Sequence, residues 1–301
     1  MLAVFESSAI LFIFITLGFI LGKAKIVKNE HSQILSKLLV YVFLPCNVFK
    51  TFLNNFEPAK LKSGYEYIIL SVIILVGMLI FAYFAAKPFS KESYERYIYE
   101  YSIIIPNYGY MGYALSELLL GEQGCLAFMI FSVPLSLYIH TYGYSRLTKK
   151  KFSLKSLIDP TIIATVLGIV AGLLSVSLPE VATEVITKAS GCMAPVSMLL
   201  SGIVISGFSF KRILGQKKVY ILTAIRLVAI PLVLLAVLKI FRVDVEMVKI
   251  AVLFYALPCG MNTIIFPRSV NENCEIGAGL ALVATALSLV TLPIIMAIAG
   301  I

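Results

Sequence analysis

Two short segments of this chain place proline, glycine and amide side chains in the middle of otherwise apolar stretches. The first segment is Pro106-Asn107-Tyr108-Gly109, and the second is Pro258-Cys259-Gly260-Met261-Asn262. Proline removes a backbone donor and clashes with the preceding helical turn, and glycine weakens a helix that would continue beyond it. Both segments are therefore predicted to interrupt a helix and to leave backbone polar groups open for binding.

The open groups at such breaks suit an anion or a polar acid. The second half of an interrupted helix points free amides and a partial positive charge at the break, and Asn107 and Asn262 add neutral donors. An amide side chain also accepts hydrogen bonds, so a neutral or zwitterionic substrate stays open. Neither break contains an aspartate, and no acidic pair lies at mid-depth, as a cation site or a proton antiporter would be expected to show.

The elements that carry these segments belong in a lipid bilayer. Of the 301 residues, 60% are apolar and 14% are charged, and the mean hydropathy is +0.96. A crossing needs about 20 helical residues, and the apolar runs lack the alternation of a β-barrel. We expect an all-α integral membrane protein with ten transmembrane helices, at 5–22, 34–53, 66–86, 97–120, 125–145, 160–178, 186–207, 219–241, 247–267 and 277–299.

The same unit occurs twice along the chain. Pro45 and Pro195 are 150 residues apart, and Pro106 and Pro258 are 152 apart. Because each copy holds five crossings, an odd number, the second copy must enter the membrane from the opposite side. The predicted divisions are a first five-helix repeat at 1–145, a basic cytoplasmic linker at 146–159 and an inverted second repeat at 160–301. Interrupted helices in matching positions of two inverted halves point to the substrate site of a transporter.

Basic residues set the expected orientation. Lys23, Lys25 and Lys28 follow the first helix, and the linker is also basic, which places both on the cytoplasmic side. The first ten residues have no positive charge, so we do not expect a cleavable signal peptide there. We therefore expect a multi-pass protein of the cell membrane with both termini outside the cytoplasm.

Other functional classes fit poorly. The net charge of +9 is scattered over loops without an aromatic platform, which indicates contact with anionic lipid rather than nucleic acid. The five cysteines form no CxxC pair, so neither a metal site nor a disulfide is expected. No P-loop lysine and no hydrolytic triad is found. We expect no cofactor and no enzyme activity.

Several of the singled-out residues have a structural alternative. Asn107 and Asn262 could bond across helices without touching a ligand. Pro45 and Pro195 are interpreted as hinge or scaffold positions. Glu100 and Arg226 fall inside predicted helices, where an unpaired charge costs about 2.5 to 3.5 kcal/mol. They are expected to pair with each other or to face water, with a gating or proton role left open.

Several motifs along the whole chain resemble the auxin efflux carrier family, which includes the plant PIN carriers and their bacterial relatives. They are 105–112, Gly121-Glu122, 256–260, Pro293, Asp159-Pro160-Thr161 and 224–227. The resemblance implies two inverted five-helix repeats whose fourth and ninth helices cross beside the substrate, near the bilayer midplane. By the same likeness, Asn107 contacts the substrate at one crossover and 258–262 does so at the other. The first, second, sixth and seventh helices would form a scaffold or dimer domain, and helices 3–5 and 8–10 a moving transport bundle.

The chain lacks the long central hydrophilic loop of the plant carriers, which argues against kinase regulation and against auxin as the substrate. Bacterial relatives are similar to malate or malonate carriers. We therefore expect a secondary transporter for a small organic acid, working by alternating access, with a homodimer left open. The alternatives are a sodium- or proton-coupled symporter of related fold, or a membrane sensor that binds a ligand at the crossover without moving it.

Overall fold

The computed structural model describes residues 2–28, 32–55, 61–149, 160–207, 215–270 and 272–300, and within these ranges it contains helices and no β-strand. The expected linker at 146–159 therefore lies outside the described residues from position 150 onward.

Within the described ranges, the first half of the chain contains seven α-helices joined in places by short π-helical turns. They are α1 (Leu2–Lys23), α2 (Ser32–Leu38), η2 (Leu39–Phe43), α3 (Leu44–Asn55), α4 (Leu61–Ala86), α5 (Ser93–Ile104), η4 (Tyr108–Gly112), α6 (Tyr113–Tyr138), η5 (Ile139–Gly143) and α7 (Tyr144–Thr148). The second half continues with α8 (Pro160–Leu173), α9 (Glu180–Gly191), α10 (Met193–Ser206), α12 (Lys217–Ala224), η7 (Ile225–Ala229), α13 (Ile230–Ile240), α14 (Val245–Ala256), α15 (Asn262–Ser269) and α16 (Glu275–Ala299).

Six helices in the described ranges are long and apolar enough to cross a membrane. This finding supports a multi-pass membrane protein. The six long helices are fewer than the ten crossings expected from the sequence. Part of the difference lies in α5 and α14, which have 12 residues each. At 1.5 Å per residue such a helix is about 18 Å long, whereas a hydrocarbon core is about 30 Å thick. The ten-helix inverted repeat stays a prediction.

The Gly121-Glu122 motif forms a break within α6. Gly121 has φ 69° and ψ −175°, so the helix stops and restarts at this residue. A positive φ is a conformation that glycine adopts without strain. The long helical stretch from Tyr113 to Thr148 is therefore two segments joined at a kink.

Glycine allows two helices from opposite ends of the chain to pack at very short distance. A methyl group at Gly18 in α1 would collide with the carbonyl oxygen of Leu199 in α10, and one at Gly202 would collide with the backbone at Ile15. Small residues bring membrane helices together in this way. Gly168 plays the same role where α8 packs on α3.

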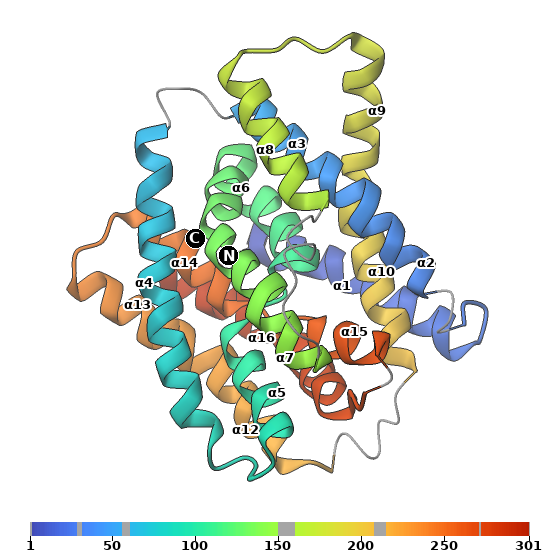
Figure 1. Cartoon of the computed structure of the whole chain (residues 1–301), viewed down its shortest axis with the longest axis vertical. Helices are drawn as coiled ribbons and strands as arrows, with labels where there is room; N and C mark the ends of the chain where they lie inside the picture. Colours follow the sequence, from blue (N-terminus) through green and yellow to red (C-terminus); the bar gives the residue numbers. More distant parts are fainter. Residues whose placement is uncertain are drawn as a thin grey trace.

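The helices pack as two groups (Figure 1). One group contains α1, α2, α3, α8, α9 and α10, and the other contains α4, α5, α6, α12, α13, α14 and α16. Within the second group α14 is the central element, since Ile250 to Ala256 are at most 2% exposed. The expected division into a scaffold and a moving transport bundle stays a prediction.

Candidate functional site

The first expected break is present between α5 and α6. Helix α5 ends at Ile104, Ile105 is extended, and the π-helical turn η4 begins at Tyr108. Pro106 causes the stop, because it has no N–H to donate to Ser102 four residues earlier. The segment from Pro106 to Tyr108 is buried, whereas Gly109 is half-buried.

The second expected break separates α14 from α15. Helix α14 ends at Ala256, Leu257 is extended, and α15 starts at Asn262. Pro258 removes a donor here as Pro106 does in the first break. Cys259 and Met261 are buried at 0% and 3% exposure, and Asn262 is half-buried.

The two breaks contact each other directly. Pro106 and Cys259 form an isolated antiparallel bridge. The Asn107 N–H donates to the Pro258 carbonyl at 2.8 Å, and the Gly260 N–H donates to the Ile105 carbonyl at 3.1 Å. Backbone groups released by one broken helix are thus satisfied by the other, as buried backbone requires. The segments singled out from the sequence lie together, and we call this pair of bridged breaks the crossover.

Gly260 stands where the two backbones approach closely, so a side chain there would be tightly packed. A Cβ at this position would lie 3.2 Å from the Pro106 carbonyl oxygen and 3.4 Å from Cγ2 of Ile105. At Gly109, in contrast, a Cβ would meet nothing within 4 Å. The two glycines therefore have different roles, although the sequence placed both beside a break.

The two asparagines have different surroundings. Asn107 is 4% exposed, and its side chain does not cap the turn that follows it. The Asn262 side chain donates from Nδ2 to the Tyr101 hydroxyl at 3.1 Å, across to α5. The structural alternative, a bond between helices, is therefore realised at Asn262. A ligand contact by either residue stays a prediction.

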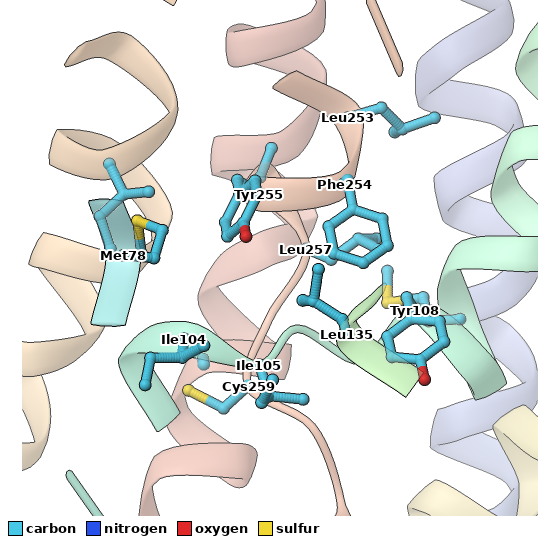
Figure 2. Packing of buried hydrophobic residues seen from close by; sticks show 14 of the residues in the cluster. Met78, Ile104, Ile105, Tyr108, Leu135, Leu253, Phe254, Tyr255, Leu257 and Cys259 are labelled. Carbon is cyan, nitrogen blue, oxygen red and sulfur yellow. The ribbon is translucent and has the colours of Figure 1, made fainter. Parts of the chain in front are cut away.

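Aromatic rings connect the crossover to a nearby cavity. The Tyr108 ring stacks on Phe254 (Figure 2), with centroids 5.3 Å apart. It also meets the Tyr113 ring edge-on at 5.7 Å. Tyr113 lines a largely apolar cavity of about 460 Å³ between α3 and α8 on one side and α4 and α6 on the other. Its hydroxyl lies 2.9 Å from the Ser132 hydroxyl, which lines the same cavity.

Glu100 and Arg226 do not pair with each other, which corrects one of the sequence expectations. Glu100 forms an ion pair with Arg96, one helical turn earlier, with 3.5 Å between Oε1 and Nε. Arg226 is fully buried and donates from Nη1 to the Ile103 carbonyl at 3.1 Å. The sequence could place both charges inside helices, but it could not show which groups face them.

Pro45 and Pro195 lie in the first turns of α3 and α10. Both prolines lie inside longer helical stretches, Ser32–Asn54 and Glu180–Ser206, in which each removes one backbone donor. Neither proline lies at the crossover bridge. Their local position agrees with a scaffold or hinge role, which stays a prediction.

Asn47 was missed by the sequence reasoning. It is 3% exposed, and its Nδ2 lies 3.0 Å from the Ser190 hydroxyl and 3.5 Å from a Glu117 carboxylate oxygen. It therefore joins α3 to α9 and to α6, the last of which belongs to the other group of helices. The sequence did contain a signal for Asn47, because this amide follows Pro45 by two residues in an apolar segment. Asn107 was identified by a similar pattern, an amide next to Pro106.

The part of the chain that the structure describes contains no group of three or more side chains that could hold a metal ion. The site therefore consists of backbone groups, two amides, aromatic rings and one buried arginine.

An all-helical, apolar fold with two bridged helix breaks defines a membrane transport protein. The family described as "Membrane transport protein" matches this chain at residues 3–151 and 145–296, so the chain belongs to it. This is the auxin efflux carrier family that the motifs indicated.

Relatives of the chain carry the same general description. The uncharacterized transporter YfdV of Escherichia coli strain K12 is 20% identical over 292 residues, which is 92% of each chain. The uncharacterized transporter MJ1031 of Methanocaldococcus jannaschii is 26% identical over 216 residues, covering 67% of this chain and 69% of the relative. Neither name specifies a substrate.

Proposed function

We propose that this protein is a secondary transporter that moves a small organic anion, such as malate or malonate, across the cytoplasmic membrane by alternating access. The observation that carries the proposal is the backbone bridge between the two broken helices. Half-helices that meet inside a transporter build its substrate site from their exposed ends. Membership in a transporter family supports the same general class.

The proposed architecture has ten crossings in two inverted repeats, and the two broken helices support it. Helices α5 and α14 both have 12 residues, and each begins with an acidic cap that accepts two backbone amides. The caps are Glu92 and Asp244, which are 152 residues apart, as Pro106 and Pro258 are. A shared cap, length and proline at one offset are what duplication of a single unit would leave.

The proposed preference for an anion follows from the direction of the helix ends at the crossover. The turn η4 leads into α6, and α15 begins at Asn262, so two N-terminal ends start at the breaks. Each such end carries a charge of roughly +0.5 and amides without a helical partner. Asn107 and Asn262 stand at these two ends and could hydrogen-bond a carboxylate.

Movement is proposed at the boundary between the two groups of helices. The group of α1, α2, α3, α8, α9 and α10 would act as a fixed scaffold, and it could also carry a homodimer interface. The cavity of about 460 Å³ lies at this boundary, next to Tyr113. A solute that reaches the crossover through it would be exposed to one side of the membrane at a time.

Two other functions stay open and make different predictions. A sodium- or proton-coupled symporter would stop working when its ion gradient is removed. A membrane sensor would bind a ligand at the crossover and show no flux. The helix ends at the crossover could bind a ligand in a symporter and in a sensor, so a measurement must distinguish these two functions.

The test starts with a thermal-shift screen of the purified protein against small carboxylates. The best ligand, radiolabelled, is then followed into proteoliposomes in which potassium and valinomycin set the membrane potential. An inside-positive potential should drive uptake without a proton or sodium gradient, and protein-free liposomes give the background. Binding without flux would reject the transporter in favour of the sensor.

A further inference from the structure

The buried arginine in η7 has an unusual environment for a charged side chain. Arg226 is 0% exposed, and the described residues place no carboxylate at ion-pairing distance from it. Its Nη1 donates to the Ile103 carbonyl at 3.1 Å, and its guanidinium lies 5.4 Å from the centroid of the Tyr255 ring. Its Nε and Nη2 are buried without a hydrogen-bond partner in this structure. A buried cation needs a source of negative potential, and no carboxylate supplies it here.

The first source of negative potential is the C-terminal end of α5. In a continuous helix the Asn107 N–H would bond the Ile103 carbonyl, but it donates to Pro258 instead. The Ile103 carbonyl is therefore open, and Arg226 fills the place of the missing donor. The need for this arginine follows from the way the crossover is built.

The second source is the C-terminal end of α14. Pro258 has no N–H for the Phe254 carbonyl, and the Gly260 N–H donates across the crossover to Ile105. Tyr255, whose ring faces the guanidinium, belongs to the last turn of this helix. The turn η7 packs against both α5 and α14. Arg226 thus contacts the final turns of both broken helices.

The charge of the arginine matches that of the two C-terminal ends taken by themselves, apart from the two N-terminal ends of the crossover. Each helix C-terminus carries roughly −0.5 elementary charge, so two ends together carry about −1, which one guanidinium offsets. In transporters with broken helices, carbonyls and C-terminal ends of this kind can hold a bound sodium ion. Arginine suits a permanent role here because it stays charged and is more weakly hydrated than lysine.

We propose that Arg226 is the counter-charge of the crossover: its guanidinium holds the C-terminal ends of α5 and α14 together, in the place where a bound metal cation would otherwise be needed. This proposal rests on the proposed transport function only in the experiment that measures flux, and the melting experiment does not depend on it. Arg226 acts as a positioning residue, since it supports the bridge behind Asn107 and Gly260 instead of contacting the solute.

The first experiment needs no substrate. Arg226→Ala is compared with wild type and with Arg242→Ala, a control that removes an exposed arginine in the turn after α13. Purified proteins are heated in detergent with methylguanidinium chloride, sodium chloride or tetramethylammonium chloride at equal millimolar concentration. Methylguanidinium should raise the melting temperature of Arg226→Ala by several degrees relative to tetramethylammonium, and leave the other two proteins unchanged. An equal response of all three proteins would overturn the proposal.

The second experiment measures the role of charge by flux. Arg226→Gln removes the charge at similar length and should lower flux roughly tenfold to a hundredfold, the range typical of losing a group that supports a binding site. Arg226→Lys keeps the charge and should stay within a few fold of wild type. Equal flux of the Gln and Lys variants would contradict the counter-charge. If Arg226→Ala cannot be purified, this pair still decides the question.

The two proposals fail in different ways. Wild-type flux should be the same in sodium and in choline medium, and a requirement for sodium would overturn the resident counter-charge while leaving a transporter. Absence of any flux, together with a methylguanidinium response of Arg226→Ala, would reject the transport function and leave the counter-charge standing.

Discussion

The glycine at the crossover gives the sharpest test of the bridged breaks. Gly260→Val would push a branched side chain against the Pro106 carbonyl, which already lies 3.2 Å from the position of a Cβ. Either the side chain or the backbone must move, and the backbone is held by two hydrogen bonds of 2.8 and 3.1 Å. Each bond contributes about 0.5–1.5 kcal/mol net, so losing both costs about 1–3 kcal/mol.

This cost should appear in binding and in flux. At 1.4 kcal/mol per tenfold change, a loss of 1–3 kcal/mol corresponds to roughly a fivefold to 150-fold weaker apparent affinity for the solute. Gly260→Ala should have a smaller effect, because an Ala Cβ needs a shift of only a few tenths of an ångström. The assay is concentration-dependent uptake into proteoliposomes, with a thermal melt of each variant to confirm folding.

The matched control is Gly109, which also lies beside a break. A Cβ at Gly109 meets nothing within 4 Å, so Gly109→Ala should keep wild-type affinity. Since η4 begins at Tyr108, alanine there should slightly favour the helix, by about 0.5–1 kcal/mol. If Gly260→Val and Gly109→Ala have the same affinity as wild type, the bridge between the breaks does not support the site.

Further expectations concern the asparagines, a helix cap and the topology. Asn107→Ala and Asn262→Ala should both reduce ligand binding and flux while the protein stays folded; normal transport by both variants would refute the assigned site. Tyr101→Phe removes the partner of Asn262 alone and should cost about 0.6 kcal/mol of stability in a melt. Asp244→Ala removes an oxygen that accepts from two amides at 2.9 and 3.3 Å, and should destabilise by about 1 kcal/mol, whereas Asp244→Asn should keep most of the cap. Lys151→Cys, in a background without the native cysteines, should react with an impermeant maleimide only from the cytoplasmic side; labelling from outside would overturn the orientation.

The breaks could be found from the sequence because their cause is local. Pro106 and Pro258 lack an N–H wherever they stand, and a helix that reaches them must stop. Gly18 and Gly22 stand four residues apart, a spacing that places both on one face of a helix, but this spacing does not show that α10 covers that face.

The partners of the singled-out groups could not be found in this way. Pairing Glu100 with Arg226 followed from two charges at similar depth, but depth does not determine which way a side chain faces. The partner of Arg226 is a backbone carbonyl 123 residues away, and backbone carbonyls have no sequence signature. Asn47 was overlooked for a similar reason, since its contact with Ser190 spans 143 residues.

The sequence by itself determined that this chain is a helical membrane protein of a transporter family and where two of its helices break. Those properties follow from apolar content, proline chemistry and motifs, which act within a few residues. Only the tertiary structure decided that the Asn107 amide bonds the Pro258 carbonyl of the other break. It also decided that Gly260 lies against the backbone of the first break, and that Arg226 contacts the last turns of α5 and α14. These contacts depend on how helices far apart in the chain approach each other, and that approach is set by packing over the whole molecule.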